Sequence, residues 1–145
     1  HVDQELNDDF CAIFASTVEL IQHEINSKEN NEMSREVFFH ALKKSRTPWK
    51  LFVHVRGPRG KFINADHQPV SGAYPISKWR AGEYIEDRHA IHVDRSSPPG
   101  RYTVQIGLWN RRVKGERASR AVAESEDVRV DSQRRVHLLQ ITVVR

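Results

Sequence analysis

Hydrophobic and polar residues alternate along several short stretches of this chain, and such alternation gives a strand one apolar and one polar face. The clearest stretches run from Lys50 to Arg56 and from Arg101 to Trp109. Others are predicted at 17–25, 35–42, 61–66, 83–93, 128–130 and 136–144, with turn-forming residues between them. An apolar strand face needs a second sheet to cover it. The pattern therefore predicts an all-β fold, a single antiparallel β-sandwich of immunoglobulin-like or jelly-roll type with about seven to nine strands.

The N-terminal part of the chain fits two patterns. Between Phe10 and Ile25 the apolar residues recur near helical spacing, but 17–25 also fits an edge strand. The strand is favoured because the rest of the chain predicts strands. Residues 1–16 are therefore expected to be a lead-in segment, and residues 17–145 the β-sandwich domain.

Composition narrows the class of protein. A length of 145 residues fits one domain, and 38% hydrophobic with 29% charged residues is typical of a folded, soluble protein. The formal net charge is +4, with one basic cluster between Arg111 and Arg120. Acidic residues follow that cluster closely, and no nucleic-acid-binding motif accompanies it. No nucleic acid partner is therefore predicted.

Cysteine and histidine usage gives no sign of a metal or a cofactor. Cys11 is the only cysteine, which rules out an intrachain disulfide and argues against a thiolate zinc site. His89 and His92 would fall on opposite faces of a strand and make a poor chelating pair. No apolar run approaches the roughly 18 residues of a membrane span. The chain begins at His1, so an excised domain or a processed product is expected.

The candidate site is a ring-rich loop, residues 67–83, expected to join two strands of one sheet. Sugar recognition uses an aromatic ring stacked on the apolar face of the sugar, with polar side chains on its hydroxyls. The alternative is structural, with a tryptophan that plugs one end of the sandwich and aspartates that cap turns. In the strand after the loop, Tyr84, His89, Ile91 and Val93 are expected to be buried. The predicted ligand-binding residues are His54, Asp66, Tyr74, Trp79, Arg80 and Asp87.

A hydrogen bond between His54 and Asp66 is predicted, because the two residues lie on neighbouring strands of one expected hairpin. A catalytic dyad would also need a nucleophile, and no motif supplies one. Glycosidase carboxylates need a defined separation, which the sequence does not give. The chain is therefore predicted not to be an enzyme, and no cofactor is expected.

The order and spacing of these motifs resemble a known family. It is the soluble β-sandwich domain at the C-terminal end of bacterial protein-mannosyltransferase-like membrane glycosyltransferases, and of related envelope proteins. The chain departs from the family pattern at Trp109, where tyrosine is usual, and in the more basic segment 111–120. The matching motifs, spread over 18–144, are Leu51 to His54, Gly60-Lys61, Ala65-Asp66, Pro69, Gly72, Tyr74-Pro75, Trp79, Gly82-Glu83, Asp87, Pro98 to Gly100 with Tyr102, and Gly107 to Trp109.

The resemblance implies a non-catalytic, extracytoplasmic (periplasmic) module that binds carbohydrate or serves as an accessory domain in a cell-envelope glycan or glycosyltransferase system. The implied ligand is a glycan or a lipid-linked sugar. An envelope or membrane protein partner is expected, with a membrane anchor elsewhere in the full-length protein. The alternative is an interaction or scaffold domain that docks a partner through a sheet edge or the basic 111–120 loop.

Overall fold

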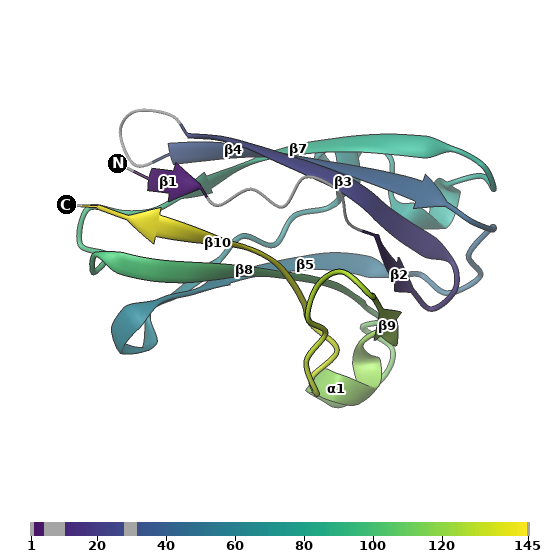
Figure 1. Cartoon of the computed structure of the whole chain (residues 1–145). Helices are drawn as coiled ribbons and strands as arrows, with labels where there is room; N and C mark the ends of the chain where they lie inside the picture. The colour runs from purple at the N-terminus through teal and green to yellow at the C-terminus, as the bar shows by residue number, and fades with distance from the viewer. Residues whose placement is uncertain (1, 5–10, 28–31, 145) are drawn as a thin grey trace.

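The computed structural model describes residues 2–4, 11–27 and 32–144, which form two antiparallel sheets packed face to face (Figure 1). These residues contain ten strands, so the predicted antiparallel sandwich is confirmed with slightly more strands than expected. In spatial order, the first sheet consists of β1 (Val2–Gln4), β10 (Val136–Val143), β8 (Gly100–Trp109), β5 (Lys50–Arg56) and β6 (Phe62–Asn64). The second sheet consists of β7 (Tyr84–His92), β4 (Glu32–Ala41), β3 (Val18–Ser27), β2 (Ala12–Phe14) and β9 (Ala123–Glu124).

The core lies between the sheets, and β5 and β8 supply its centre. Each strand sends alternate apolar side chains inward, as the sequence pattern predicts, because successive side chains of a strand point to opposite faces. Full burial of one such side chain stabilises the fold by roughly 1.5–3 kcal/mol. The inward residues, none more than 1% exposed, are Leu51, Val53, Val55, Tyr102, Val104, Ile106 and Leu108.

The ring-rich segment 67–83 connects the two sheets. The expectation that its flanking strands share one sheet is wrong, because β6 pairs with β5 whereas β7 pairs with β4. The segment contains two short 3-10 helices, η2 (Pro69–Gly72) and η3 (Ile76–Lys78). It buries Pro69 and Ile76 as it crosses. Its apolar side chains therefore close one end of the core.

The predicted lead-in, residues 1–16, is wrong for the part that the structure describes. Strand β1 pairs with β10, and β2 pairs with β3 and β9, so both belong to the sandwich. The sequence did not indicate these strands because each is only three residues long, too short to show an alternating pattern. The strand predicted at 17–25 is confirmed as β3. Phe10 lies outside the described residues.

Two further expectations about strands need correction. Tyr84 is 69% exposed rather than buried, because Ile85 and Asp87 occupy the inward positions of β7. His89 is partly buried, and only Ile91 and Val93 of the four expected residues are fully buried. The strand predicted at 128–130 is a single bridge between Val130 and Val136.

Residues 110–120, which follow β8, leave the first sheet and fold back over its outer face. We call this segment the excursion. It contains α1 (Glu116–Ser119), which lies below β5 and β8 in Figure 1. The backbone N–H of Asn110 donates to the carbonyl of Ser119, at 2.7 Å, and Trp109 forms a bridge with Arg120. The excursion is therefore closed at its base, and its last residues lie beside the end of β8.

Candidate functional site

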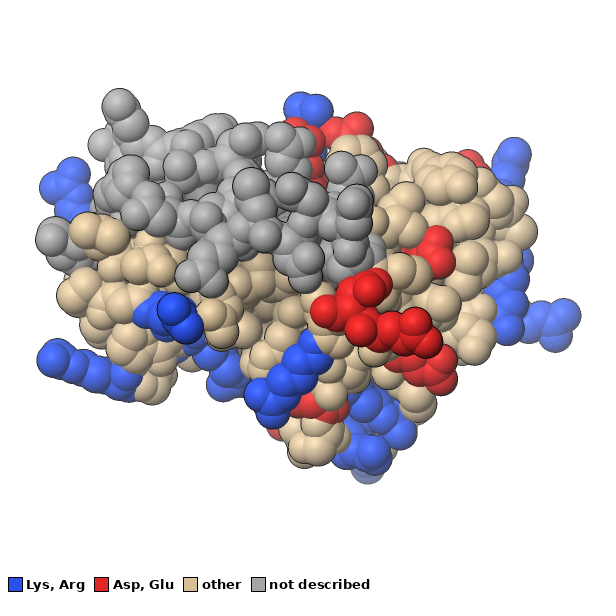
Figure 2. All heavy atoms as spheres, in the orientation of Figure 1, with Lys and Arg blue, Asp and Glu red and all other residues tan. Residues whose placement is uncertain are grey.

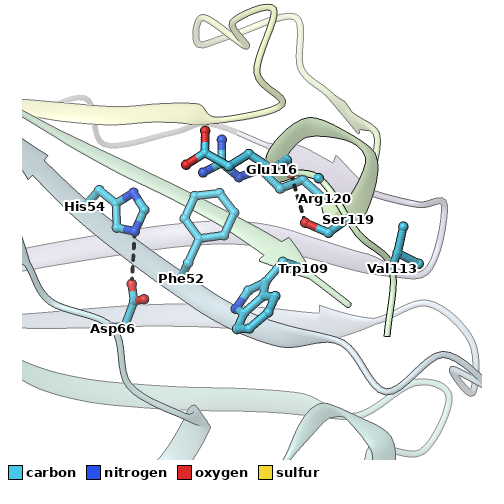
Figure 3. A pocket seen from close by; sticks show the side chains of 9 residues that line it. Phe52, His54, Asp66, Trp109, Val113, Glu116, Ser119 and Arg120 are labelled. Atoms are coloured by element: carbon cyan, nitrogen blue, oxygen red, sulfur yellow. Dashed lines mark hydrogen bonds and ion pairs between the residues drawn. The ribbon is translucent and has the colours of Figure 1, made fainter. Parts of the chain in front are cut away.

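A hollow of about 310 Å³ opens on the outer face of the first sheet, beneath the 110–120 excursion (Figure 3). We call it the β5–β8 hollow. Strand β5 provides Phe52 and His54, since its outward positions alternate with the core positions. The other lining residues come from the end of the β5–β6 hairpin, the end of β8 and the excursion. They are Asp66, Trp109, Val113, Gly115, Glu116, Ser119 and Arg120.

Phe52 forms the floor of the hollow. Its ring covers Gly107, the residue opposite it on β8, where an added Cβ would lie 2.3 Å from the ring. The guanidinium carbon of Arg120 lies 4.7 Å from the centroid of the same ring (Figure 3). The backbone of Gly107, the ring of Phe52 and the guanidinium group of Arg120 therefore lie one above another. Because glycine has no side chain, the ring can lie directly on the backbone.

Replacing Gly107 with alanine should lower the free energy of unfolding by about 1–3 kcal/mol, because the Phe52 ring would have to move. Chemical unfolding of the purified variant measures this. The double variant Phe52→Leu/Gly107→Ala should lose less stability than the sum of the two single variants, since the smaller side chain relieves the clash. Unchanged stability of Gly107→Ala would show that the ring does not lie over β8.

Arg120 is a buried cation that lines the hollow. It is 8% exposed, and its Nη1 donates to the carbonyl of Gln133 at 3.1 Å. Burial lowers the pKa of Arg120 from its ordinary value, while the charge of Glu116 acts in the opposite direction. No carboxylate among the described residues lies within ion-pair distance of this guanidinium group. A guanidinium group stays charged at neutral pH, so the hollow contains a permanent positive charge.

Asp66 and His54 form the other polar edge. The Nε2 of His54 lies 3.4 Å from Oδ1 of Asp66, which confirms the predicted contact across the hairpin (Figure 3). The same carboxylate oxygen accepts the backbone N–H of Val53 at 2.8 Å. Burial raises the pKa of Asp66, but these two hydrogen bonds outweigh it and leave the pKa below its usual value. Asp66 is therefore a carboxylate at neutral pH, and its side chain is 37% exposed.

Ser119, His54 and Asp66 all line the hollow, but they do not form a catalytic triad. The hydroxyl of Ser119 donates to the backbone carbonyl of Glu116 at 2.9 Å. The Nδ1 atom of His54, which would have to receive a serine proton, is buried and has no hydrogen-bond partner among the described residues. The arrangement offers groups that bind hydroxyls and anions, without a connected nucleophile and base.

The structure does not gather the six predicted residues at one site. His54 and Asp66 lie in the β5–β8 hollow, whereas Tyr74 and Arg80 lie on the connection between the sheets. Arg80 is exposed, and the hydroxyl of Tyr74 donates to Glu83. This bond raises the pKa of Tyr74 and lowers that of Glu83.

Trp79 and Asp87 were predicted to bind ligand, and the structure corrects both. Trp79 is 1% exposed, packs against Phe39 and donates its indole N–H to the carbonyl of Tyr74. Asp87 is fully buried and accepts hydrogen bonds from His67 and from the backbone of Val70. Neither side chain presents a surface to a ligand, because both hold the 67–83 connection in place.

The sequence interpretation missed Phe52, Trp109 and Arg120 as site residues. The alternation along Lys50–Arg56 puts Phe52 on the same outward face as His54, so Phe52 could have been inferred as a site residue. Trp109 follows the inward Leu108, so its outward position could also have been inferred. Nothing in the sequence showed that the excursion returns Arg120 over Phe52, because that contact depends on the fold of a loop.

A second hollow, of about 330 Å³, is lined by Cys11, Ile13 and Ser125 together with three acidic residues. Burial, together with Glu19, raises the pKa of the Cys11 thiol to about 11, so the thiol is protonated at neutral pH. Figure 2 shows acidic side chains gathered near the place where Figure 1 labels β9. The carboxylates that line this hollow come from Glu124, Glu126 and Asp127.

Two kinds of feature are absent from the described residues. No three His, Cys, Asp or Glu side chains in 2–4, 11–27 and 32–144 are placed to share a metal ion. In the same part of the chain, no helix has the length and apolar character needed to cross a membrane. Figure 2 shows lysine and arginine side chains spread around the molecule on this face, rather than collected in one patch.

The chain was compared with known protein families and with curated proteins. No family model matches it, and no curated protein matches it.

Proposed function

We propose that this domain is a non-catalytic carbohydrate-binding module, and that it binds a saccharide in the β5–β8 hollow. The observation that supports this most directly is the combination of Trp109 with the polar groups of Asp66, His54 and Arg120 around one opening. An indole face suits the C–H face of a sugar ring. Carboxylate and guanidinium groups suit its hydroxyls, and His54 helps to hold the carboxylate of Asp66 in place.

The size and construction of the hollow fit this use. Small-molecule sites have volumes of roughly 300–1,000 Å³ and combine apolar walls with a few placed polar groups. A hollow of about 310 Å³ suits one or two sugar rings. Two of its polar groups are held in fixed positions, Asp66 by the backbone of Val53 and Arg120 by the ring of Phe52. Fixed groups lose little freedom when a ligand binds.

The setting we propose is extracytoplasmic, in a cell-envelope glycan or glycosyltransferase system. Support comes from the resemblance of the chain to domains attached to bacterial membrane glycosyltransferases. In such a setting the module would present a glycan or a lipid-linked sugar to a membrane-bound or envelope partner. Glycan arrays of envelope sugars, followed by calorimetry of the positives, identify the ligand.

Replacing Trp109 with alanine should raise the dissociation constant for the bound saccharide at least about tenfold, because a central aromatic contact is lost. Isothermal titration calorimetry measures the change. Tyr84→Ala is the matched control, since it removes an exposed ring from the other sheet and should leave affinity unchanged. Equal affinity of Trp109→Ala and the unmodified protein would contradict a site in this hollow, and loss of affinity in Tyr84→Ala would move the site to the second sheet.

A further inference from the structure

Arg120 has hydrogen-bonding capacity that the protein does not use. A guanidinium group has five N–H donors. Among the described residues, only the carbonyl of Gln133 accepts a hydrogen bond from it. The side chain is nevertheless more than nine-tenths buried and lines the hollow. A buried charge is costly unless it is paired, so a counter-charge at this position would be strongly favoured.

The nearby carboxylates do not supply that counter-charge. Asp66 is engaged by His54 and by the backbone of Val53, at the other polar edge of the hollow. Asp131 is paired with Arg135 at 2.7 Å and with His137 at 2.9 Å. Glu116 lines the hollow but is exposed, and it makes no ion pair among the described residues. Its charge is therefore weakened by solvent at the position of Arg120.

The guanidinium group is also held in position, by the Phe52 ring and by the carbonyl of Gln133. It lies over the Phe52 ring, which lies in turn over Gly107. A planar fork held in this way matches two oxygens of a carboxylate or a phosphate, whereas single hydroxyls would use it only in part. The segment that covers the hollow is basic in sequence, since residues 110–120 contain five lysine or arginine residues and one acidic residue, Glu116. Basic residues around an opening steer anions towards it.

We infer that the saccharide bound in the β5–β8 hollow is acidic, and that its carboxylate or phosphate pairs with Arg120. This inference rests on the proposed saccharide site and specifies its ligand. In this arrangement the sugar ring contacts Trp109, its hydroxyls bind Asp66, which lies against His54, and its anionic group binds the guanidinium group.

The test compares neutral sugars with their acidic counterparts by calorimetry at low salt. The pairs are glucose with glucuronate and galactose with galacturonate, and glucose 6-phosphate distinguishes a phosphate from a carboxylate. The acidic member should bind roughly ten- to a hundredfold more tightly, which is the range for a hydrogen-bonded charge pair. Added salt should reduce the difference only in part, because the pair is buried.

Two variants assign this preference to Arg120. Arg120→Met keeps the bulk of the side chain, removes the charge and should abolish the preference for the acidic sugar. Arg120→Lys keeps the charge but loses the planar pair of N–H donors, so it should retain a smaller preference for the acidic sugar. Arg111→Met, which removes an exposed charge from the same segment, is the control and should behave like the unmodified protein. Thermal unfolding of each variant confirms that it is folded.

The outcomes separate the two claims. Equal binding of neutral and acidic sugars, or an acidic preference that survives in folded Arg120→Met, would overturn the inference and leave the saccharide site intact. An absence of binding by every sugar of both kinds would overturn the proposed function together with the inference. An acidic preference that disappears in Arg120→Met and persists in Arg111→Met supports both.

Discussion

Replacing Trp79 with alanine is expected to lower the free energy of unfolding by about 3–5 kcal/mol. The ring is 1% exposed, and its centroid lies 5.5 Å from that of Phe39 on β4. Its indole N–H donates to the carbonyl of Tyr74 at 2.9 Å. Truncation leaves a cavity at the end of the core and removes the partner of a backbone carbonyl, and both effects destabilise the fold.

Urea unfolding followed by circular dichroism measures this loss. Tyr84→Ala serves as the control, since Tyr84 is 69% exposed and surface substitutions usually change stability by less than about 0.5 kcal/mol. A change for Trp79→Ala as small as that of the control would mean that the ring is a surface platform. In that case Trp79 would again be a candidate for stacking against a sugar ring.

Replacing Asp87 with alanine is expected to cost about 3–5 kcal/mol, because Asp87 accepts two hydrogen bonds and each bond to a carboxylate contributes about 1.5–3 kcal/mol. Asp87 has no exposed surface and lies on β7 of the second sheet. It accepts hydrogen bonds from His67 Nε2 and, at 2.9 Å, from the backbone N–H of Val70. Without the carboxylate both donors lose their shared partner, so the start of the 67–83 connection should detach from β7.

The same unfolding assay measures the effect of Asp87→Ala, with Glu86→Ala as the exposed neighbour on the same strand. The double variant His67→Ala/Asp87→Ala should be less destabilised than the sum of the single variants, because each removes the same interaction. Strict additivity of the two losses would contradict a direct link between these residues.

The strands of the core could be predicted from the sequence because alternation is a local property. Val53 is inward and His54 outward by their order along the chain alone, and the structure agrees. The contact between His54 and Asp66 could also be predicted from the sequence, since both residues belong to one hairpin with a short turn. Short-range pairing of this kind needs no knowledge of the rest of the fold.

The function of the ring-rich connection could not be predicted in the same way. Trp79 fits a sugar platform and a core plug equally well by residue type, and its burial depends on Phe39, forty residues away. Asp87 looked like an exposed carboxylate until the inward positions of β7 were known. Arg120 looked like part of a solvated basic run, and only the closed excursion between β8 and β9 places it over Phe52.

The most direct test of a ligand site in the β5–β8 hollow is an NMR titration of the three tryptophan indole N–H signals with glucuronate. Trp109 lines the hollow, Trp79 is buried in the core, and Trp49 packs against it. A saturable shift of the Trp109 signal, with the Trp79 signal unchanged, is the predicted result. A shift of the Trp79 signal while Trp109 stays fixed would contradict the account and return the site to the 67–83 connection.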